Sequence, residues 1–374
     1  MKLIVAMLFF SIIYMTQKKL FLKYWNTNLS VHINLSNTIL TEGEKTYLEE
    51  IIENDKILPL PILYVKFAAP QSFLFTKDDQ NKKLQDNYRN DVFSVMPFQR
   101  ISRKYSFTCS KRGFYSIKHL DIISKDLFLT EILASHTKVD ACIHVLPKKV
   151  LNNELKTNLI LSLGDLVNNS TLHEDPFEFK SIRDYQPYDS MSKINWKSTA
   201  RTGQLQVNTY FSTYSKDVSL YLNVEPNALY RADYLQEESI RLASTIASEL
   251  LRFNVSFSFY TNGIDIISKQ PYSIEAGSGM NHIHQIDLAL ARIDLAQKPH
   301  DFTNILDITH KDPQKHQIII ISNYRKEDLL TSYSNIIERG FSTLFIVPEF
   351  KNTNIRLDYP NMKVWEVDFL EKIS

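Results

Sequence analysis

The chain opens with an apolar run. Residues 3–15 are apolar except for one serine, and three more apolar residues follow a pair of lysines. A bilayer span needs about 20 residues, which this stretch supplies if the helix continues to about Trp25 and the lysines reach the headgroups. We therefore predict a membrane anchor over residues 1–27. A cleaved signal peptide and a buried core element are the alternatives.

Positive charge gathers on one side of this run. Lys2 precedes it, whereas three lysines follow it: Lys18, Lys19 and Lys23. The positive-inside rule then predicts a single-pass protein of the cell membrane whose main domains face the cytoplasm. No small-x-small cleavage motif follows Met15, which counts against a signal peptide.

Alternation of apolar and polar residues dominates residues 28–150. The period of two is clearest over residues 29–35, where it is typical of a half-buried strand. Further strands are expected at 62–67, 105–109 and 139–146, with a turn at Gly113. The charged stretch 78–91 is predicted to be a loop. Short strands separated by turn signals favour an antiparallel β-sandwich-like domain.

Residues 213–374 show a different pattern, in which short apolar runs alternate with helical spacing. Strands are expected at 218–222, 255–260, 317–321, 343–347 and 364–367, and helices at 230–253, 282–295 and 329–339. The pair Asn262–Gly263 is typical of a tight turn. Strands that alternate with helices predict a doubly wound parallel sheet, so the fold class is multi-domain, with an α/β domain at the C-terminus.

Residues 151–212 combine a connector with a dense motif. A short helix is expected within the connector, over residues 152–163. Pro187 favours a turn because its ring presets φ, and Asp189 or Ser190 is expected to cap the helix that follows.

The predicted motif helix has one apolar and one basic side. Ile194, Trp196 and Ala200 are expected to pack inward, and three cations repeat every four residues: Lys193, Lys197 and Arg201. Gly203 suits the residue that ends a helix, and a strand should follow.

The charged residues of the motif admit two interpretations. The group comprises Arg183, Asp184, Asp189, Lys197 and Arg201. Arginine pairs bidentately with carboxylates, so these residues can brace the turn. The same charges can instead form a network that binds a partner or an anionic group.

Composition adds mainly exclusions. The 374 residues carry a net charge of +1, so we expect no nucleic-acid partner. The two cysteines, Cys109 and Cys142, suggest reduced thiols rather than a disulfide framework. No phosphate-binding loop or nucleophile elbow occurs, and His282 and His284 lie too close in sequence to share a helix face. We predict no catalytic residues and no cofactor.

The motif resembles the signature of the family called domain of unknown function 58 (DUF58). An arginine–x–tyrosine–x–proline–x–aspartate pattern is followed by isoleucine–x–tryptophan and alanine–arginine–x–glycine–x–leucine, matched here by Arg183, Tyr185, Pro187, Asp189, Ile194, Trp196, Ala200, Arg201, Gly203 and Leu205. A departure is Tyr188, where the family commonly has glycine, and it concerns the turn type. Upstream, residues 112–114, 126–128 and 145–147 are similar to the family's β domain.

The resemblance implies more than the residues alone. Members commonly begin with one or two membrane helices, and their C-terminal part resembles a von Willebrand factor A domain. Such domains often bind a divalent cation through an aspartate–x–serine–x–serine loop after the first strand. The corresponding loop here carries Asn223, Glu225 and Asn227, so the metal ligands expected by resemblance are largely replaced, and we expect no bound metal.

Three functions follow for testing. The first is a non-enzymatic, membrane-anchored adaptor that, by resemblance, works beside a MoxR-type AAA+ ATPase in the assembly or maturation of other proteins. The second is a divalent-metal-dependent ligand-binding or adhesion module. The third is an enzyme that uses the network from Arg183 to Arg201 as an anion site.

Overall fold

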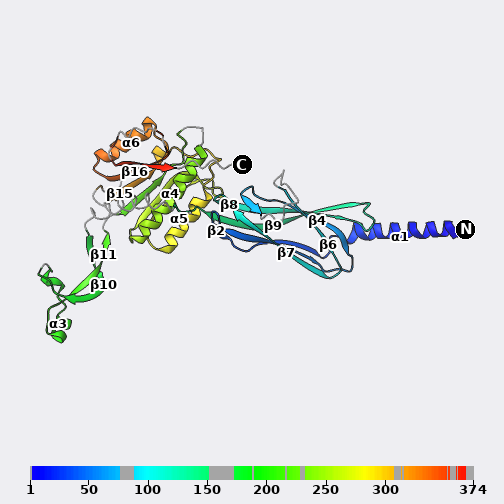
Figure 1. Ribbon diagram of the computed structural model, residues 1–374, viewed down its shortest axis with the longest axis horizontal. Coiled ribbons are helices and arrows are strands. Elements are labelled where there is room, and N and C mark those ends of the chain that lie inside the picture. The colour runs from blue at the N-terminus through cyan, green and yellow to red at the C-terminus, as the bar shows by residue number, and fades with distance from the viewer. Residues whose placement is uncertain are drawn as a thin grey trace. The chain divides into compact units, whose positions relative to one another are not determined.

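The computed structural model describes residues 2–75, 88–150, 172–187, 189–214, 217–227, 232–306, 313, 316–351, 353, 359 and 361–367. The chain divides into two compact units, Met1–Lys148 and Lys149–Ser374, shown from blue to red in Figure 1. The predicted helix over residues 152–163 lies outside the described residues.

The first unit begins with a long helix, α1 (Lys2–Tyr24). Residues Leu3–Tyr24 are long and apolar enough to cross a membrane. The last turns of the helix differ from the rest, because Phe21 is only 1% exposed and Trp25, just beyond it, is also buried in the β domain. The helix and the β domain therefore share one core.

Two sheets form the β domain. The first has the order β1 (Leu29–Leu35), β3 (Lys45–Asn54), β7 (Gln99–Cys109) and β5 (Phe73–Phe75), with all neighbours antiparallel. The second has the order β2 (Ile39–Thr41), β9 (Ile132–Leu146), β8 (Gly113–Lys125), β4 (Leu60–Ala68) and β6 (Tyr88–Val95). Here the short edge strand β2 runs parallel to β9 and the other pairs are antiparallel.

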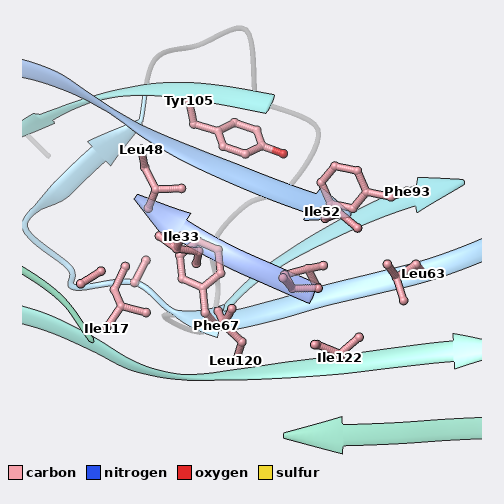
Figure 2. Close-up of a cluster of buried hydrophobic side chains, with 14 of the residues drawn as sticks. Ile33, Leu48, Ile52, Leu63, Phe67, Phe93, Tyr105, Ile117, Leu120 and Ile122 are labelled. Carbon is pink, nitrogen blue, oxygen red and sulfur yellow. The ribbon is translucent and has the colours of Figure 1, made fainter. Parts of the chain in front are cut away.

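The core of the β domain lies between these sheets (Figure 2). Alternate residues of each strand point inward, as Leu48 and Ile52 do on β3 and Phe67 does on β4. Burial of each such side chain contributes about 1.5–3 kcal/mol. The predicted loop over residues 78–91 is partly wrong, because residues 88–91 pair with β4 as part of β6. The polarity of that segment reflects an edge strand rather than a loop.

The second unit contains a six-stranded sheet. Its order is β14 (Pro271–Gly277), β13 (Phe257–Ile264), β12 (Asp217–Leu222), β15 (His316–Ile321), β16 (Ser342–Phe350) and β17 (Met362–Val367). All neighbours are parallel except the edge pair β13 and β14. The chain order reverses at β12, so strands are added on both sides of it.

Helices cover both faces of this sheet. On one face, α4 (Ala232–Arg252) and α5 (Met280–Arg292) pack on a buried cluster of sheet residues. On the other, α6 (Glu327–Glu338) and the short 3-10 helix η3 (Phe302–Asn304) pack on a second cluster. This arrangement confirms the predicted doubly wound α/β sheet.

One predicted turn in this unit is wrong. Asn262 and Gly263 lie inside β13, and Asn262 is fully buried. Its amide donates to the Asn223 side chain and to the His300 carbonyl, and its Oδ1 accepts from the Val224 backbone. The pair is polar because it joins neighbouring loops, not because the chain reverses there.

A two-stranded arm completes the second unit. Strands β10 (Leu172–Asp184) and β11 (Gln206–Tyr214) are antiparallel to each other, and within the described residues they belong to no larger sheet. Between them lie the 3-10 helix η2 (Met191–Lys193) and the helix α3 (Trp196–Thr202). The arm therefore carries the dense motif.

Candidate functional site

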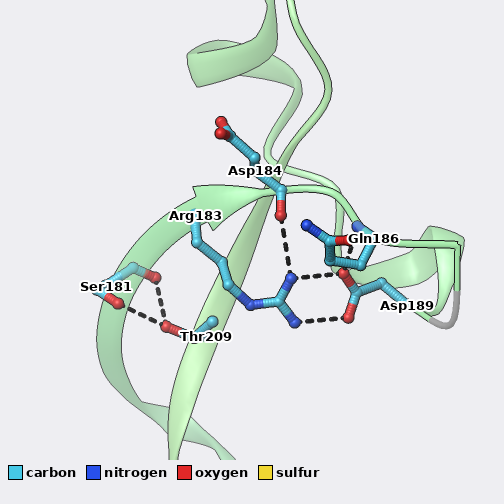
Figure 3. A network of polar contacts seen from close by, with 6 residues as sticks. All are labelled: Ser181, Arg183, Asp184, Gln186, Asp189 and Thr209. Atoms are coloured by element: carbon cyan, nitrogen blue, oxygen red, sulfur yellow. Dashed lines mark hydrogen bonds and ion pairs between the residues drawn. The ribbon is translucent and has the colours of Figure 1, made fainter.

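The arm is closed by one bidentate ion pair (Figure 3). The Arg183 guanidinium at the end of β10 donates two hydrogen bonds of 2.7 Å to the two carboxylate oxygens of Asp189. It also donates to the Asp184 carbonyl at 3.0 Å, while Asp189 accepts a third bond from the Gln186 backbone at 2.8 Å. These bonds, led by those from Arg183, hold the pKa of Asp189 below its ordinary value. The turn over residues 184–189 is therefore fixed by its own side chains.

A second set of bonds joins the two strands behind this turn. The Tyr185 backbone donates to the Leu205 carbonyl at 2.9 Å, and the Gln206 side chain donates to the Asp184 carboxylate. Further along the strands, the hydroxyls of Ser181 and Thr209 are 2.7 Å apart. Asp184 and Tyr185 thus join the two strands where the tip of the arm begins.

The helix of the motif is shorter than the sequence predicts. Ser190 caps only η2, and Asn195 caps α3 by accepting from the Ser198 backbone at 2.9 Å. The prediction that Asp189 or Ser190 caps the motif helix is therefore wrong for α3, because Asp189 is engaged by Arg183. Asn195 is itself a preferred capping residue, so its position directly before the helix was a usable signal.

The C-terminal end of α3 agrees with the sequence prediction. Gly203 adopts φ 73°, in the left-handed region, and its backbone donates to the Thr199 carbonyl. The predicted basic stripe is broken, because Lys193 lies on η2 while Lys197 and Arg201 lie on α3. A change of backbone direction at Ile194 and Asn195 removes the helical spacing on which the stripe depended.

Trp196 is not buried, which corrects the inward packing predicted for it. Its side chain is 66% exposed, and Ala200 on the same helix is exposed as well. Of the three predicted inward residues only Ile194 is buried, where it bridges to the buried Val207 of β11. The tip of the arm is too small to enclose an indole, so one aliphatic pair forms its core.

The exposed surface of the tip combines apolar and basic groups. Met191 and Leu205 are exposed together with Trp196, and Lys197 and Arg201 are exposed on α3. The structure records no hydrogen bond or ion pair from the Lys197 or Arg201 side chain to any residue it describes. We call Met191, Trp196, Lys197, Arg201 and Leu205 the arm surface. Met191 was not predicted, since nothing in its sequence context distinguishes an exposed methionine from a core one.

The loop after β12 uses its polar atoms internally. The Asn223 side-chain oxygen accepts from the Glu225 backbone and from Asn262, both at 2.8 Å, and Asn227 accepts from the Arg325 backbone at 3.3 Å. Burial raises the pKa of Glu225, and the nearby Asp301 and Asp328 raise it further. Among the described residues no group of three or more His, Cys, Asp or Glu side chains is arranged to hold a metal ion.

The side chains of Ser322 and Asn323, directly after β15, are also engaged. The Ser322 hydroxyl donates to the Tyr324 carbonyl, and the Asn323 amide donates to the Pro348 carbonyl at 2.9 Å. Both side chains stabilise the backbone at the ends of β15 and β16.

Comparison with solved structures gives only remote similarity. Domains D2 and D3 of the major pilin SpaD from Corynebacterium diphtheriae align with 33% of this chain at 7% identity and a TM-score of 0.26, and the chain spans 57% of the length of that protein. A non-cellulosomal cohesin from Archaeoglobus fulgidus aligns with 34% of this chain and 97% of its own length, at 12% identity and a TM-score of 0.22. TM-scores this low carry no conclusion about the present chain.

The sequence comparisons are more specific. No curated protein matches the chain. Residues 181–342 match the family described as "Protein of unknown function DUF58", a stretch that starts in the arm and ends at β16. The similarity to DUF58 therefore covers the motif of the arm and the sheet strands from β12 to β15.

Proposed function

We propose that the protein is a non-enzymatic, membrane-anchored adaptor whose arm surface docks a partner protein. The observation that carries this proposal is the exposed Trp196 beside the two exposed cations Lys197 and Arg201, all on a tip that is internally braced. Tryptophan and arginine dominate the binding energy of protein interfaces. A braced tip also loses little conformational freedom when it binds.

The charges of the motif divide between two tasks. Arg183 and Asp189 satisfy each other with two bonds, so their charge is used inside the arm. The charges of Lys197 and Arg201 are available to a partner. That partner must supply acidic groups around an apolar slot for Trp196. The DUF58 resemblance nominates a MoxR-type AAA+ ATPase as that partner.

The remaining parts of the chain fit the same proposal. Helix α1 supplies the anchor, with the main domains on the cytoplasmic side where an ATPase would meet them. The doubly wound sheet with one antiparallel edge strand supports the expected von Willebrand factor A-like domain. We assign it an interaction role without a metal, since the side-chain oxygens of Asn223 and Asn227 already accept hydrogen bonds from Glu225, Asn262 and Arg325.

Affinity capture from membranes tests the proposal. The wild-type chain is compared with the double variant Lys197→Glu/Arg201→Glu and with the matched control Lys269→Glu/Lys298→Glu, which makes the same change in charge at exposed positions away from the arm. We expect a AAA+ ATPase in the wild-type and control captures and its loss from the arm variant. Equal recovery by all three chains, or no ATPase in any capture, contradicts the proposal.

A further inference from the structure

One face of α1 is held by the loop that joins β8 to β9. Tyr14 donates to the Thr130 hydroxyl at 3.3 Å, and its ring centroid lies 5.9 Å from that of Phe128. Gln17 donates to the Asp126 carboxylate at 2.8 Å, and Lys18 forms an ion pair with Glu131. The loop thus follows the helix from residue 14 to residue 18.

Asp126 organises this loop from a fully buried position. Besides Gln17, it accepts from the Thr130 backbone at 2.6 Å, the Thr130 hydroxyl at 2.9 Å and the Glu131 backbone at 2.8 Å. Burial opposes the charge, but these hydrogen bonds outweigh it and lower the pKa of Asp126 to about 2. The hydrogen bonds of Asp126 order the loop and hold a carboxylate next to the helix.

The other side chains of the loop are large, apolar and exposed. Leu127, Phe128 and Leu129 are each about half exposed, and Ile132 at the start of β9 is 69% exposed. Leu129 also has φ 61°, a left-handed conformation that costs a leucine about 1 kcal/mol or more. We call Leu127, Phe128, Leu129 and Ile132 the β8–β9 tip. An exposed apolar tip on a rigid loop indicates a surface that contacts a protein or a membrane.

Two neighbouring loops present apolar side chains at the same end of the β domain. The strand register places the β3–β4 and β6–β7 connections there, since Leu60 pairs with Val95 and Leu63 pairs with Ser124 near the end of β8. Their exposed side chains are Ile57, Met96 and Phe98. Figure 1 shows α1 leaving the β domain at this end. The apolar tip therefore belongs to a wider apolar end.

The α1 residues that the tip loop contacts indicate how deep the tip lies in a bilayer. The tip loop contacts α1 at residues 14–18, whereas the stretch that is apolar enough to span a membrane continues to Tyr24. Leu20 and Leu22, beyond the loop contacts, are still exposed. A bilayer that covers these leucines also covers the level of the tip.

Two polar side chains at this level are paired with the loop. Gln17 and Lys18 interrupt the apolar helix, and each has a partner on the loop, Asp126 and Glu131 respectively. Unpaired polar groups are costly at membrane depth, and paired ones are tolerated. The loop thus pairs with two of the helix residues that oppose insertion, and the exposed Lys19 can extend its charged end to the headgroups.

We propose that the β8–β9 tip inserts into the headgroup–acyl boundary of a lipid bilayer beside α1, as a second membrane contact of the β domain. This inference rests on the proposed membrane anchoring by α1. The occupant is lipid rather than protein, because the tip continues the exposed apolar surface of the helix and offers no free charged group for a partner to recognise. In this arrangement Ile57, Met96 and Phe98, on the two neighbouring loops, meet the headgroups.

Fluorescence quenching in vesicles tests the inference. The full chain carries Cys142→Ser together with one new cysteine, labelled with a nitrobenzoxadiazole dye, in vesicles of phosphatidylcholine and phosphatidylglycerol that contain nitroxide lipids. Cys109 is fully buried and its pKa is raised to about 11, so it stays unlabelled. The three label sites are Phe128→Cys on the tip, Phe10→Cys on the exposed helix and Lys111→Cys at the opposite end of β8.

We expect the dye at positions 10 and 128 to shift to the blue and lose most of its emission to nitroxide lipids, while position 111 is unaffected. Quenching at position 10 without quenching at 128 overturns the inference and leaves the anchor intact. Absence of quenching at position 10 refutes the anchor itself. A blue shift at 128 without quenching by lipid shows that a second copy of the chain covers the tip, which also overturns the inference.

Discussion

The arm surface and the β8–β9 tip both expose large apolar side chains beside charged residues. They differ in whether those charged residues are left exposed or are paired within the chain. On the arm, the bracing pair is internal and the cations Lys197 and Arg201 are left exposed. At the tip, Lys18 pairs with Glu131, and the Gln17 amide donates to the buried Asp126. Exposed cations around a tryptophan suit an acidic protein, whereas neutralised polar groups around apolar side chains suit lipid.

The comparison also separates two uses of a buried carboxylate. Asp126 has four hydrogen bonds and a lowered pKa. Glu50, on β3 in the same β domain, is equally buried, but neither of its carboxylate oxygens has a hydrogen-bond partner among the described residues. Burial, and then the nearby Asp91, raise the pKa of Glu50 to about 8. Satisfied and unsatisfied carboxylates should therefore respond to pH in opposite directions.

The largest effect is expected where α1 joins the core of the β domain. Phe21→Ala removes a fully buried ring and should cost about 3–5 kcal/mol of unfolding free energy. The measurement is urea unfolding of the detergent-solubilised chain. Phe10→Ala, on the exposed part of the same helix, is the matched control and should change stability little. Equal stability of the two variants would mean that the helix is not part of the core.

The unsatisfied Glu50 should make the β domain less stable at high pH. Its folded pKa lies above its ordinary value, so its stabilising contribution is complete below about pH 4.5 and declines as pH rises towards 8. The loss is on the order of 2–4 kcal/mol. Glu50→Gln should flatten this part of the pH profile of unfolding, and an unchanged profile argues against the raised pKa. Asp126→Asn should leave this pH window unaffected, because its carboxylate titrates below it.

If Arg183 braces the arm through its two parallel hydrogen bonds, a lysine with the same charge should not replace it. Arg183→Lys keeps the cation but loses the two parallel bonds to Asp189, so the arm should be cut faster by protease and bind its partner at least about tenfold more weakly. Limited proteolysis of the second unit provides the readout. Arg201→Ala should weaken binding while leaving the arm as resistant as wild type. If both variants are cut alike, the division between bracing and presenting residues is wrong.

Trp196 should contribute to binding and not to folding. Trp196→Ala is expected to weaken binding of the captured partner by about 2 kcal/mol, or about 30-fold, while the thermal midpoint stays unchanged. Ile267→Ala, another exposed apolar side chain of the second unit, is the control. A drop in the thermal midpoint of the tryptophan variant would mean that Trp196 contributes to folding.

The smallest expected effect is that of divalent cations on the loop after β12. A cation at 100 times its dissociation constant would add about 2.7 kcal/mol to the stability of the folded state. We expect no shift of the thermal midpoint with millimolar calcium or magnesium, because the side-chain oxygens of Asn223 and Asn227 already accept hydrogen bonds from backbone N–H groups. A clear upward shift would favour the metal-dependent module.

Much of the architecture could be predicted from periodicity. Alternation located the strands of the β domain, and continuous apolar runs such as Ile318–Ile321 located buried parallel strands. The parallel pairing of β2 with β9 could not be predicted, because three residues carry too little pattern. The continuation of β13 through Asn262 was missed, since buried polar residues that join loops look the same as turn residues.

The motif shows where sequence reasoning ends. A bracing role for the charged residues of the motif could be proposed in advance because arginine suits bidentate pairing with carboxylates, but the pairing of Arg183 with Asp189 could not. The burial of Trp196 was predicted incorrectly, since a tryptophan in a small core and a tryptophan on a binding surface have the same local pattern. The β8–β9 tip was not predicted, because its apolar residues gain meaning only beside α1.

The sharing of Phe21 and Trp25 between helix and β domain has a consequence for biogenesis. Both residues precede every strand of the domain, so they leave the ribosome first and must wait for residues up to β9 before their core closes. A chain clipped after the apolar helix would lack the core side chain of Phe21. Folding of the domain thereby depends on whether α1 is still attached, and a copy that has lost it is less stable and more open to proteolysis.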